Sequence, residues 1–206
     1  LDPARIEDVV MGCALQQGST GFNVARQGAL WAGLPQSVPG TTLDRQCGSG
    51  LMAIAAAANR IQTGEQDIAV AGGVESVSLV QTPHMNGYRT ADPKLVAEIP
   101  QLYMTMLETA EIVAERYGVS REAQDAYALQ SQQRTAQAQR EGRLDAEIVP
   151  VTTVMRVTNR ETGETSDREV TIAMDEGNRP QTVLEDLARL KPVFSGGQRI
   201  AEGRCI

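Results

Sequence analysis

The sequence predicts an α/β fold with a parallel sheet at its start. Residues 9–15 and 67–74 are short apolar runs without polar alternation, which is typical of strands covered on both faces. Between these runs, Asn23 can cap a helix that reaches Ala32, and residues 51–61 form a nearly all-apolar helix that we expect to be buried. Residues 37–46 read as a loop and a further strand. The order strand, helix, strand, helix, strand therefore indicates parallel pairing.

After residue 78 the chain becomes more polar and richer in loops. Residues 79–100 contain several Pro, Gly, Asn and Asp residues without periodicity. The elements expected beyond them are helices over 106–117, from the Ser120 cap to Gly142 and over 184–189, and an antiparallel strand pair over 148–158 and 169–173. We therefore predict two parts, an α/β core half over residues 1–78 and an α+β excursion over residues 79–206.

Composition excludes several classes of partner. The 206-residue chain has a net charge of −7, which argues against nucleic acid or an anionic membrane surface, so an anionic ligand needs a local basic pocket. No apolar run approaches the length that spans a membrane. The cysteines Cys13, Cys47 and Cys205 fit no metal-binding spacing. These features predict free thiols in a reducing, cytoplasmic compartment and no metal site.

Cys47 is the strongest candidate for a reactive residue. It lies between a predicted strand and the first turn of the helix over 51–61, where free N–H groups and the positive end of the helix dipole favour the thiolate. Gly48 and Gly50 leave the backbone open to a substrate carbonyl, and the Cys47 amide could donate to an oxyanion. Taken alone, the pattern also fits a buried, inert cysteine beside packing glycines.

Motifs of one enzyme family occur in order along nearly the whole chain. The segment Cys47-Gly48-Ser49-Gly50, followed by an alanine-rich helix, resembles the nucleophile segment of thiolases. Further segments similar to thiolase motifs lie at residues 71–78, 109–114, 120–128, 142–150, 175–179 and 190–194. The resemblance implies a thiolase-like layered αβαβα core, present here as one partial half, with an inserted α+β loop domain that binds coenzyme A.

The resemblance also implies an activity. Thiolases are acyl-CoA C-acyltransferases that cleave 3-ketoacyl-CoA thiolytically or condense two acetyl-CoA molecules through a cysteine acyl-enzyme. Cys47 matches the cysteine that becomes acylated. Coenzyme A and acyl-CoA thioesters are then substrates, with no permanently bound cofactor. A role in fatty acid metabolism and a homodimer or homotetramer are expected on the same basis.

Coenzyme A contacts are expected in the loop domain. Arg179 matches a position that approaches the adenine end of the coenzyme, although it could also be a surface arginine. Met106 matches a pocket methionine near the pantetheine, although it could also fill a core. Thr105 stands where the family usually has a histidine, so that contact is not expected here.

The family's catalytic histidine, in a Gly-His-Pro segment, and its second cysteine, in a Cys-x-Gly segment, are not found in this sequence. The single histidine, His84, sits in a loop and is expected to be solvated. Cys205 is not followed by x-Gly, and Cys13 should be inert in a core strand. We therefore expect the physiological protein to be nearly twice this length, and residues 1–206 alone to be inactive.

Two other functions remain open on the sequence. A ketoacyl synthase-type condensing enzyme shares a cysteine at a helix start, but the segments 120–122 and 142–143 are thiolase features and disfavour it. A non-catalytic thiolase-like subunit could keep the fold without catalysis, and the retained Cys47 argues against that reading.

Overall fold

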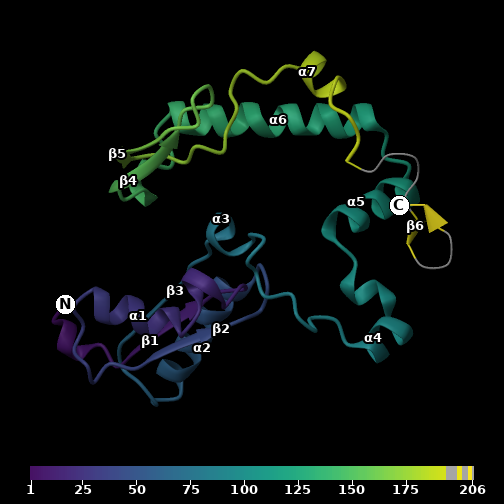
Figure 1. Cartoon of the computed structure of the whole chain (residues 1–206). Coiled ribbons are helices and arrows are strands. Elements are labelled where there is room, and N and C mark those ends of the chain that lie inside the picture. Colours follow the sequence, from purple (N-terminus) through teal and green to yellow (C-terminus); the bar gives the residue numbers. More distant parts are fainter. Residues whose placement is uncertain (194–198, 201–203, 206) are drawn as a thin grey trace. The chain divides into compact units, whose positions relative to one another are not determined.

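A computed structural model describes residues 1–193, 199–200 and 204–205 of the chain (Figure 1). It divides into two compact units, Leu1–Thr90 and Ala91–Ile206. This division falls later than the boundary predicted after residue 78, because the next segment is tied to the first unit. Helix α3 (Val77–Val80) packs on the 3-10 helix η2 (Gly18–Thr20), and the Asn86 amide donates to the Gln17 side chain at 2.7 Å. The functional division at residue 78 stays a prediction.

The first unit contains the predicted parallel sheet. Its strands are β1 (Asp8–Gly12), β2 (Gly40–Leu43) and β3 (Ala69–Gly73), in the order β2-β1-β3. Both pairs are parallel, with Val9 opposite Gly40 on one side and Val70 on the other. The expected α/β class is confirmed, and β1 is the central strand.

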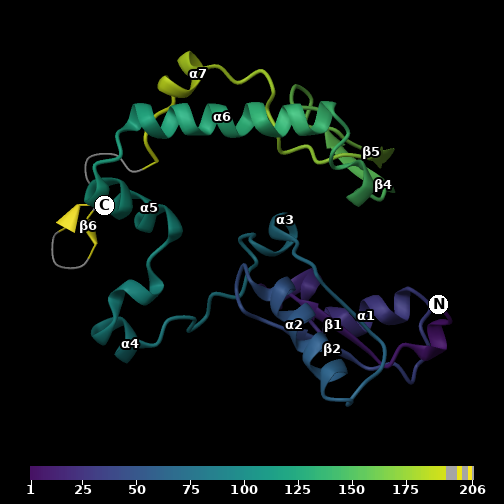
Figure 2. The ribbon, with the colours of Figure 1, turned by 180° about the vertical axis from the view of Figure 1, so that it is seen from behind.

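Two helices cover opposite faces of this sheet (Figures 1 and 2). Helix α1 (Val24–Trp31), capped by the Asn23 side chain as predicted, packs Ala25 and Ala29 against Val9. Helix α2 (Ser49–Gln62) packs its own alanines, Ala53 and Ala57, against Val10. Since neighbouring residues of a strand point to opposite faces, the sheet is the middle layer of three.

The outer face of α2 differs from the expectation. Of its residues, Ser49, Ala53 and Ala57 are buried, whereas Leu51 is 75% exposed. Ile54 and Ile61 are exposed as well. The expectation of burial therefore holds only for the inner face of this helix, because only the alanine stripe meets the sheet.

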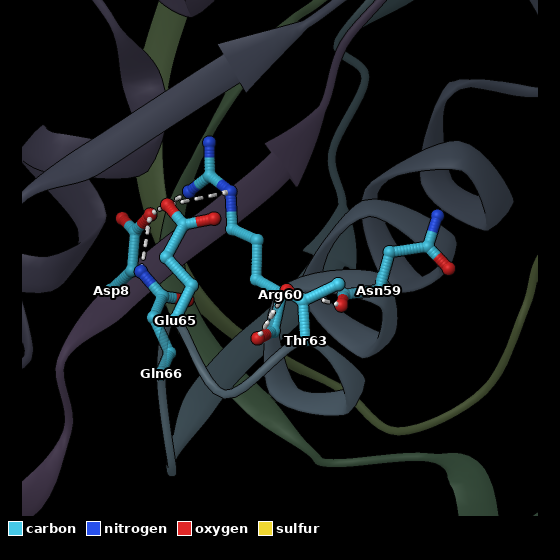
Figure 3. A network of polar contacts seen from close by, with 6 residues as sticks. All are labelled: Asp8, Asn59, Arg60, Thr63, Glu65 and Gln66. Carbon is cyan, nitrogen blue, oxygen red and sulfur yellow. Dashed lines mark hydrogen bonds and ion pairs between the residues drawn. The ribbon is translucent and has the colours of Figure 1, made fainter.

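A buried carboxylate anchors the amino-terminal end of β1 (Figure 3). Asp8 is buried, and its Oδ2 accepts hydrogen bonds from Arg60 Nη1 at 2.7 Å and from Gln66 Nε2 at 3.5 Å. Arg60 also lies 3.9 Å from Glu65. Within the described residues, Asp8 Oδ1 has no hydrogen-bond partner. Arg60 is therefore the charge that compensates Asp8, and it joins the last turn of α2 to the central strand.

Glu7 gives the first unit a predictable response to acid. Its carboxylate accepts hydrogen bonds from the Asp67 and Ile68 amides, which hold the Glu7 pKa below its ordinary value of 4.5. A depressed folded-state pKa adds stability above the unfolded pKa and loses it as pH falls through the folded value. We expect Glu7→Gln to lower stability at neutral pH and to flatten the fall in stability below about pH 4.5 in urea titrations. An acid limb as steep as that of the wild type would contradict this.

The second unit contains α4 (Pro93–Glu98), α5 (Met106–Tyr117), α6 (Arg121–Arg140), the strands β4 (Val151–Thr158) and β5 (Thr165–Ile172), and α7 (Leu184–Ala188). The helices predicted over 106–117, after Ser120 and over 184–189 are confirmed. The strands β4 and β5 form the predicted antiparallel hairpin, although β5 begins earlier, at Thr165, because pairing continues to Thr158. Short strands β6 (Arg199–Ile200) and β7 (Arg204–Cys205) follow. Helix α4 was not predicted, and Asp92 caps it ahead of Pro93.

Candidate active site

The candidate nucleophile, Cys47, lies in a tight turn between β2 and α2. Its residue is exposed, while Ser49, two positions later, is only 4% exposed. The Ser49 hydroxyl donates to the Gln46 carbonyl at 2.6 Å and accepts from the Arg45 amide at 2.8 Å. The turn therefore has a buried side that is fixed by hydrogen bonds and an open side that presents the thiol.

Three glycines set where this turn sits on the sheet. A Cβ added to Gly12, at the end of β1, would lie 2.1 Å from the Ser49 carbonyl carbon. One added to Gly73, at the end of β3, would lie 3.1 Å from Gly50 Cα. The start of α2 thus rests backbone to backbone on the carboxyl ends of two strands, which places Cys47 at that end of the sheet.

These contacts revise the expected role of one glycine and add two residues to the site. Gly50 was expected to open the backbone to substrate, but its neighbour is Gly73 of the protein itself. Gly12 and Gly73 were not singled out from the sequence. The available signal was a glycine at the end of each apolar strand run, where close backbone approach is common.

We expect Gly12→Ala to destabilise the protein by about 1–3 kcal/mol, because backbone atoms of Ser49 and Gly50 must move to admit the methyl group. Gly72→Ala is the matched control, since its Cβ would meet only the Met11 side chain, whose sulfur would lie at an ordinary 3.7 Å. Urea unfolding of both variants provides the comparison. Equal midpoints for the two variants would show that α2 is not seated as described.

Cys13, one residue after β1, is buried as expected. Its sulfur lies 3.6 Å from the Leu15 carbonyl oxygen and 3.8 Å from Glu75 Oε1. The other Glu75 carboxylate oxygen accepts from the Ala14 and Leu15 amides at 2.9 and 3.2 Å. Glu75, which follows β3, therefore ties together the chain segments that leave β1 and β3, a role that its sequence motif did not reveal.

The two residues predicted to contact coenzyme A lie in the second unit. Met106 begins α5 and is 76% exposed, so it does not fill a core within the described residues. Thr105 caps this helix through a reciprocal capping box with Glu108. Arg179 is exposed, and its amide is held by the Gln132 side chain at 2.8 Å. Both side chains are thus accessible to a ligand.

The remaining candidates have simple surroundings. His84 is exposed in a loop, as expected for a solvated histidine, and its amide donates to Thr82 Oγ1. The Cys205 side chain lies outside the described residues. Within the described part of the chain, no group of three or more His, Cys, Asp or Glu residues could hold a metal ion. None of the described helices is both long enough and apolar enough to cross a membrane.

This arrangement supports nucleophilic chemistry at Cys47. The thiol is accessible, and its backbone is fixed on one side by the buried Ser49 and on the other by the packed end of the sheet. A cysteine placed in this way can attack an electrophilic carbon without reorganising the chain.

Comparison with known proteins gives a consistent result. The family model described as "Thiolase, N-terminal domain" matches residues 1–203. A 3-ketoacyl-CoA thiolase of Bacillus subtilis is 43% identical over 97% of this chain and 50% of the relative. The human peroxisomal 3-ketoacyl-CoA thiolase is 42% identical over 94% of this chain and 44% of the relative.

Solved structures agree with the sequence relatives. The acetyl-CoA acetyltransferase of Bacillus anthracis superposes with a TM-score of 0.73 at 36% identity, covering 94% of this chain and 49% of that one. The chain spans about half the length of the curated relatives that it matches. The match over residues 1–203 and the identity along nearly the whole chain show that this chain belongs to the thiolase family.

Proposed function

We propose that the protein containing this chain is an acyl-CoA C-acyltransferase, which cleaves 3-ketoacyl-CoA thiolytically or condenses two acetyl-CoA molecules. The observation that carries the proposal is the exposed Cys47 on a turn whose backbone is fixed. Membership of the thiolase family supports the same reaction class. We also propose that the protein is a homo-oligomer in the cytoplasm and acts in fatty acid metabolism.

In the cleavage direction, Cys47 Sγ attacks the keto carbon of 3-ketoacyl-CoA. A sulfur–carbon bond forms, the bond between C2 and C3 breaks, and its electron pair leaves with acetyl-CoA as an enolate that takes up a proton. The thiolate of a second coenzyme A then attacks the acyl-enzyme and releases the shortened acyl-CoA. Cys47 is the nucleophile in this scheme, and its amide is a donor for the oxyanion of the thioester step.

The test of this proposal is direct detection of the acyl-enzyme. The full-length protein is incubated with acetoacetyl-CoA, quenched in acid and digested, and the peptide containing Cys47 is weighed. We expect an acetyl mass on Cys47 and none on the buried Cys13. An unmodified Cys47 together with thiolytic turnover would assign the nucleophile to another residue, and absence of both would favour a non-catalytic subunit.

We propose that the second unit binds coenzyme A, with Arg179 at the adenine end and Met106 beside the pantetheine. An acidic protein needs local cations for a phosphate-bearing ligand, and within the described residues the Arg179 side chain forms no ion pair. The exposure of both side chains supports this assignment.

Arg179→Ala should raise the KM for coenzyme A about tenfold with a smaller change in kcat, because the lost contact binds the ground state and the transition state alike. Arg160→Ala is the control, since Arg160 is an exposed arginine of the same unit in the turn of the β4–β5 hairpin. Steady-state thiolysis at varied coenzyme A measures both. Equal KM values for the two variants would exclude Arg179 from the pocket.

A further inference from the structure

Hydrogen bonds to both the backbone amide and the backbone carbonyl of Gln46 hold the turn before Cys47. The Gln46 amide donates to Asp44 Oδ1 at 2.7 Å. Its carbonyl oxygen accepts from the Ser49 hydroxyl at 2.6 Å and from the Ser49 amide at 3.1 Å. Gln46 itself has a φ of 51°, in the left-handed region that residues other than glycine rarely adopt. These hydrogen bonds therefore stabilise a backbone conformation that the local sequence disfavours.

The hydrogen bonds of the Gln46 carbonyl fix the direction of the peptide group between Gln46 and Cys47. No described peptide bond is cis, so the Gln46 carbonyl and the Cys47 N–H point in opposite directions. Because the carbonyl points at Ser49 in the first turn of α2, the Cys47 N–H points away from that helix. Within the described residues this N–H donates no hydrogen bond, and Cys47 is exposed. The Cys47 amide is thus free on the same residue that carries the thiol.

Ser49 does not act on a substrate directly. Its side chain is buried, and its hydroxyl both donates to Gln46 and accepts from the Arg45 amide. The proton of the hydroxyl is already used inside the turn. Ser49 can therefore affect the reaction only by fixing the backbone conformation of the turn.

We propose that Ser49 and Asp44 are positioning residues, which hold the Gln46–Cys47 peptide so that the Cys47 N–H meets the carbonyl oxygen of an incoming thioester. This inference rests on the proposed function. When the Cys47 thiolate attacks acyl-CoA, the carbonyl π electrons move to oxygen and a sulfur–carbon bond forms. The intermediate then collapses, expels the coenzyme A thiolate and leaves the acyl group on sulfur. One thiolate replaces another, so no net proton is required. The oriented amide stabilises the oxyanion in between.

Two reactions of the Cys47 thiol distinguish a role in positioning the amide from a general effect on protein stability. Alkylation by iodoacetamide needs the thiolate but forms no oxyanion, whereas acetylation by acetyl-CoA needs both. In the full-length protein, we expect Ser49→Ala to slow acetylation of Cys47 by about tenfold to a hundredfold. Its alkylation rate between pH 6 and 10 should stay within about twofold of the wild type, because the thiol remains exposed.

Asp44 provides a second and milder variant, because its residue is exposed. Asp44→Ala should slow acetylation selectively, and Asp44→Asn should restore it, since the amide oxygen can still accept from Gln46. Thr20→Val is the matched control for Ser49→Ala. It removes a buried hydroxyl that donates to the Leu15 and Gln17 carbonyls, outside the Cys47 turn, so its acetylation rate should be unchanged.

Equal loss of acetylation and alkylation in Ser49→Ala and Asp44→Ala would overturn the inference, since the turn would then position the thiol rather than the amide. Unchanged acetylation in both variants would also overturn it. Failure of the wild type to be acetylated by any acyl-CoA would instead overturn the proposed function, and the inference with it. Selective loss of acetylation with rescue by Asp44→Asn supports it.

Discussion

Replacement of Cys47 by alanine should reduce acyl transfer by about 10⁴-fold or more, because the covalent route is lost with the nucleophile. Cys47 is exposed and alanine is also small, so the folded structure should persist. Thiolysis of acetoacetyl-CoA by the full-length protein measures the loss, and circular dichroism with urea unfolding confirms the fold.

Cys13→Ala is the paired control for this experiment. Cys13 is buried and lies beside Glu75, so its removal should cost some stability but leave the rate of Cys47 acylation nearly unchanged. Activity of Cys47→Ala within tenfold of the wild type would reject Cys47 as the nucleophile.

The second large expected effect is a loss of stability when the buried Asp8 carboxylate of β1 loses its partner, Arg60. Arg60→Met should destabilise the protein by about 2–3 kcal/mol, because it leaves the Asp8 carboxylate without its compensating charge. The Asp8 side chain is 4% exposed, whereas that of Arg60 is 36% exposed and can be hydrated when its partner is lost. Asp8→Asn should therefore cost less, about 1 kcal/mol.

An exposed ion pair supplies the control. Arg143 lies 2.6 Å from Glu141, and the two side chains are 67% and 39% exposed, so neither charge is buried and Arg143→Met should change the free energy of unfolding by less than about 0.5 kcal/mol. Urea unfolding at neutral pH compares the three variants. The same cost for Arg60→Met and Arg143→Met would mean that burial of Asp8 does not govern the pair.

Local patterns predicted most of the elements. The Asn23 and Ser120 caps, the glycine after α5 and the apolar run of β1 each depend on a few neighbouring residues, and all were found in place. Short elements within the loop-rich residues 79–100 were harder to predict from the sequence. Helix α4 depends on the Asp92 cap and a proline rather than on a repeating apolar pattern.

Burial and close packing could not be predicted in the same way. The outer residues of α2 are as apolar as a core, but which face meets the sheet depends on Val10 and on the small alanines opposite it. For the site, the sequence identified Cys47 through its neighbours. It did not reveal that Gly12 and Gly73 seat the turn, since these contacts join residues far apart in the chain.

The strand order also has a consequence for folding during synthesis. Strand β1 is made before both of its partners, because β2 and β3 lie later in the chain. Its backbone N–H and C=O groups complete their pairing only when residues up to Gly73 have left the ribosome. Pairings over such separations slow folding and leave unpaired strands open to association with other chains. In this sheet, the nascent chain is therefore most vulnerable at β1, the strand that ends up most protected.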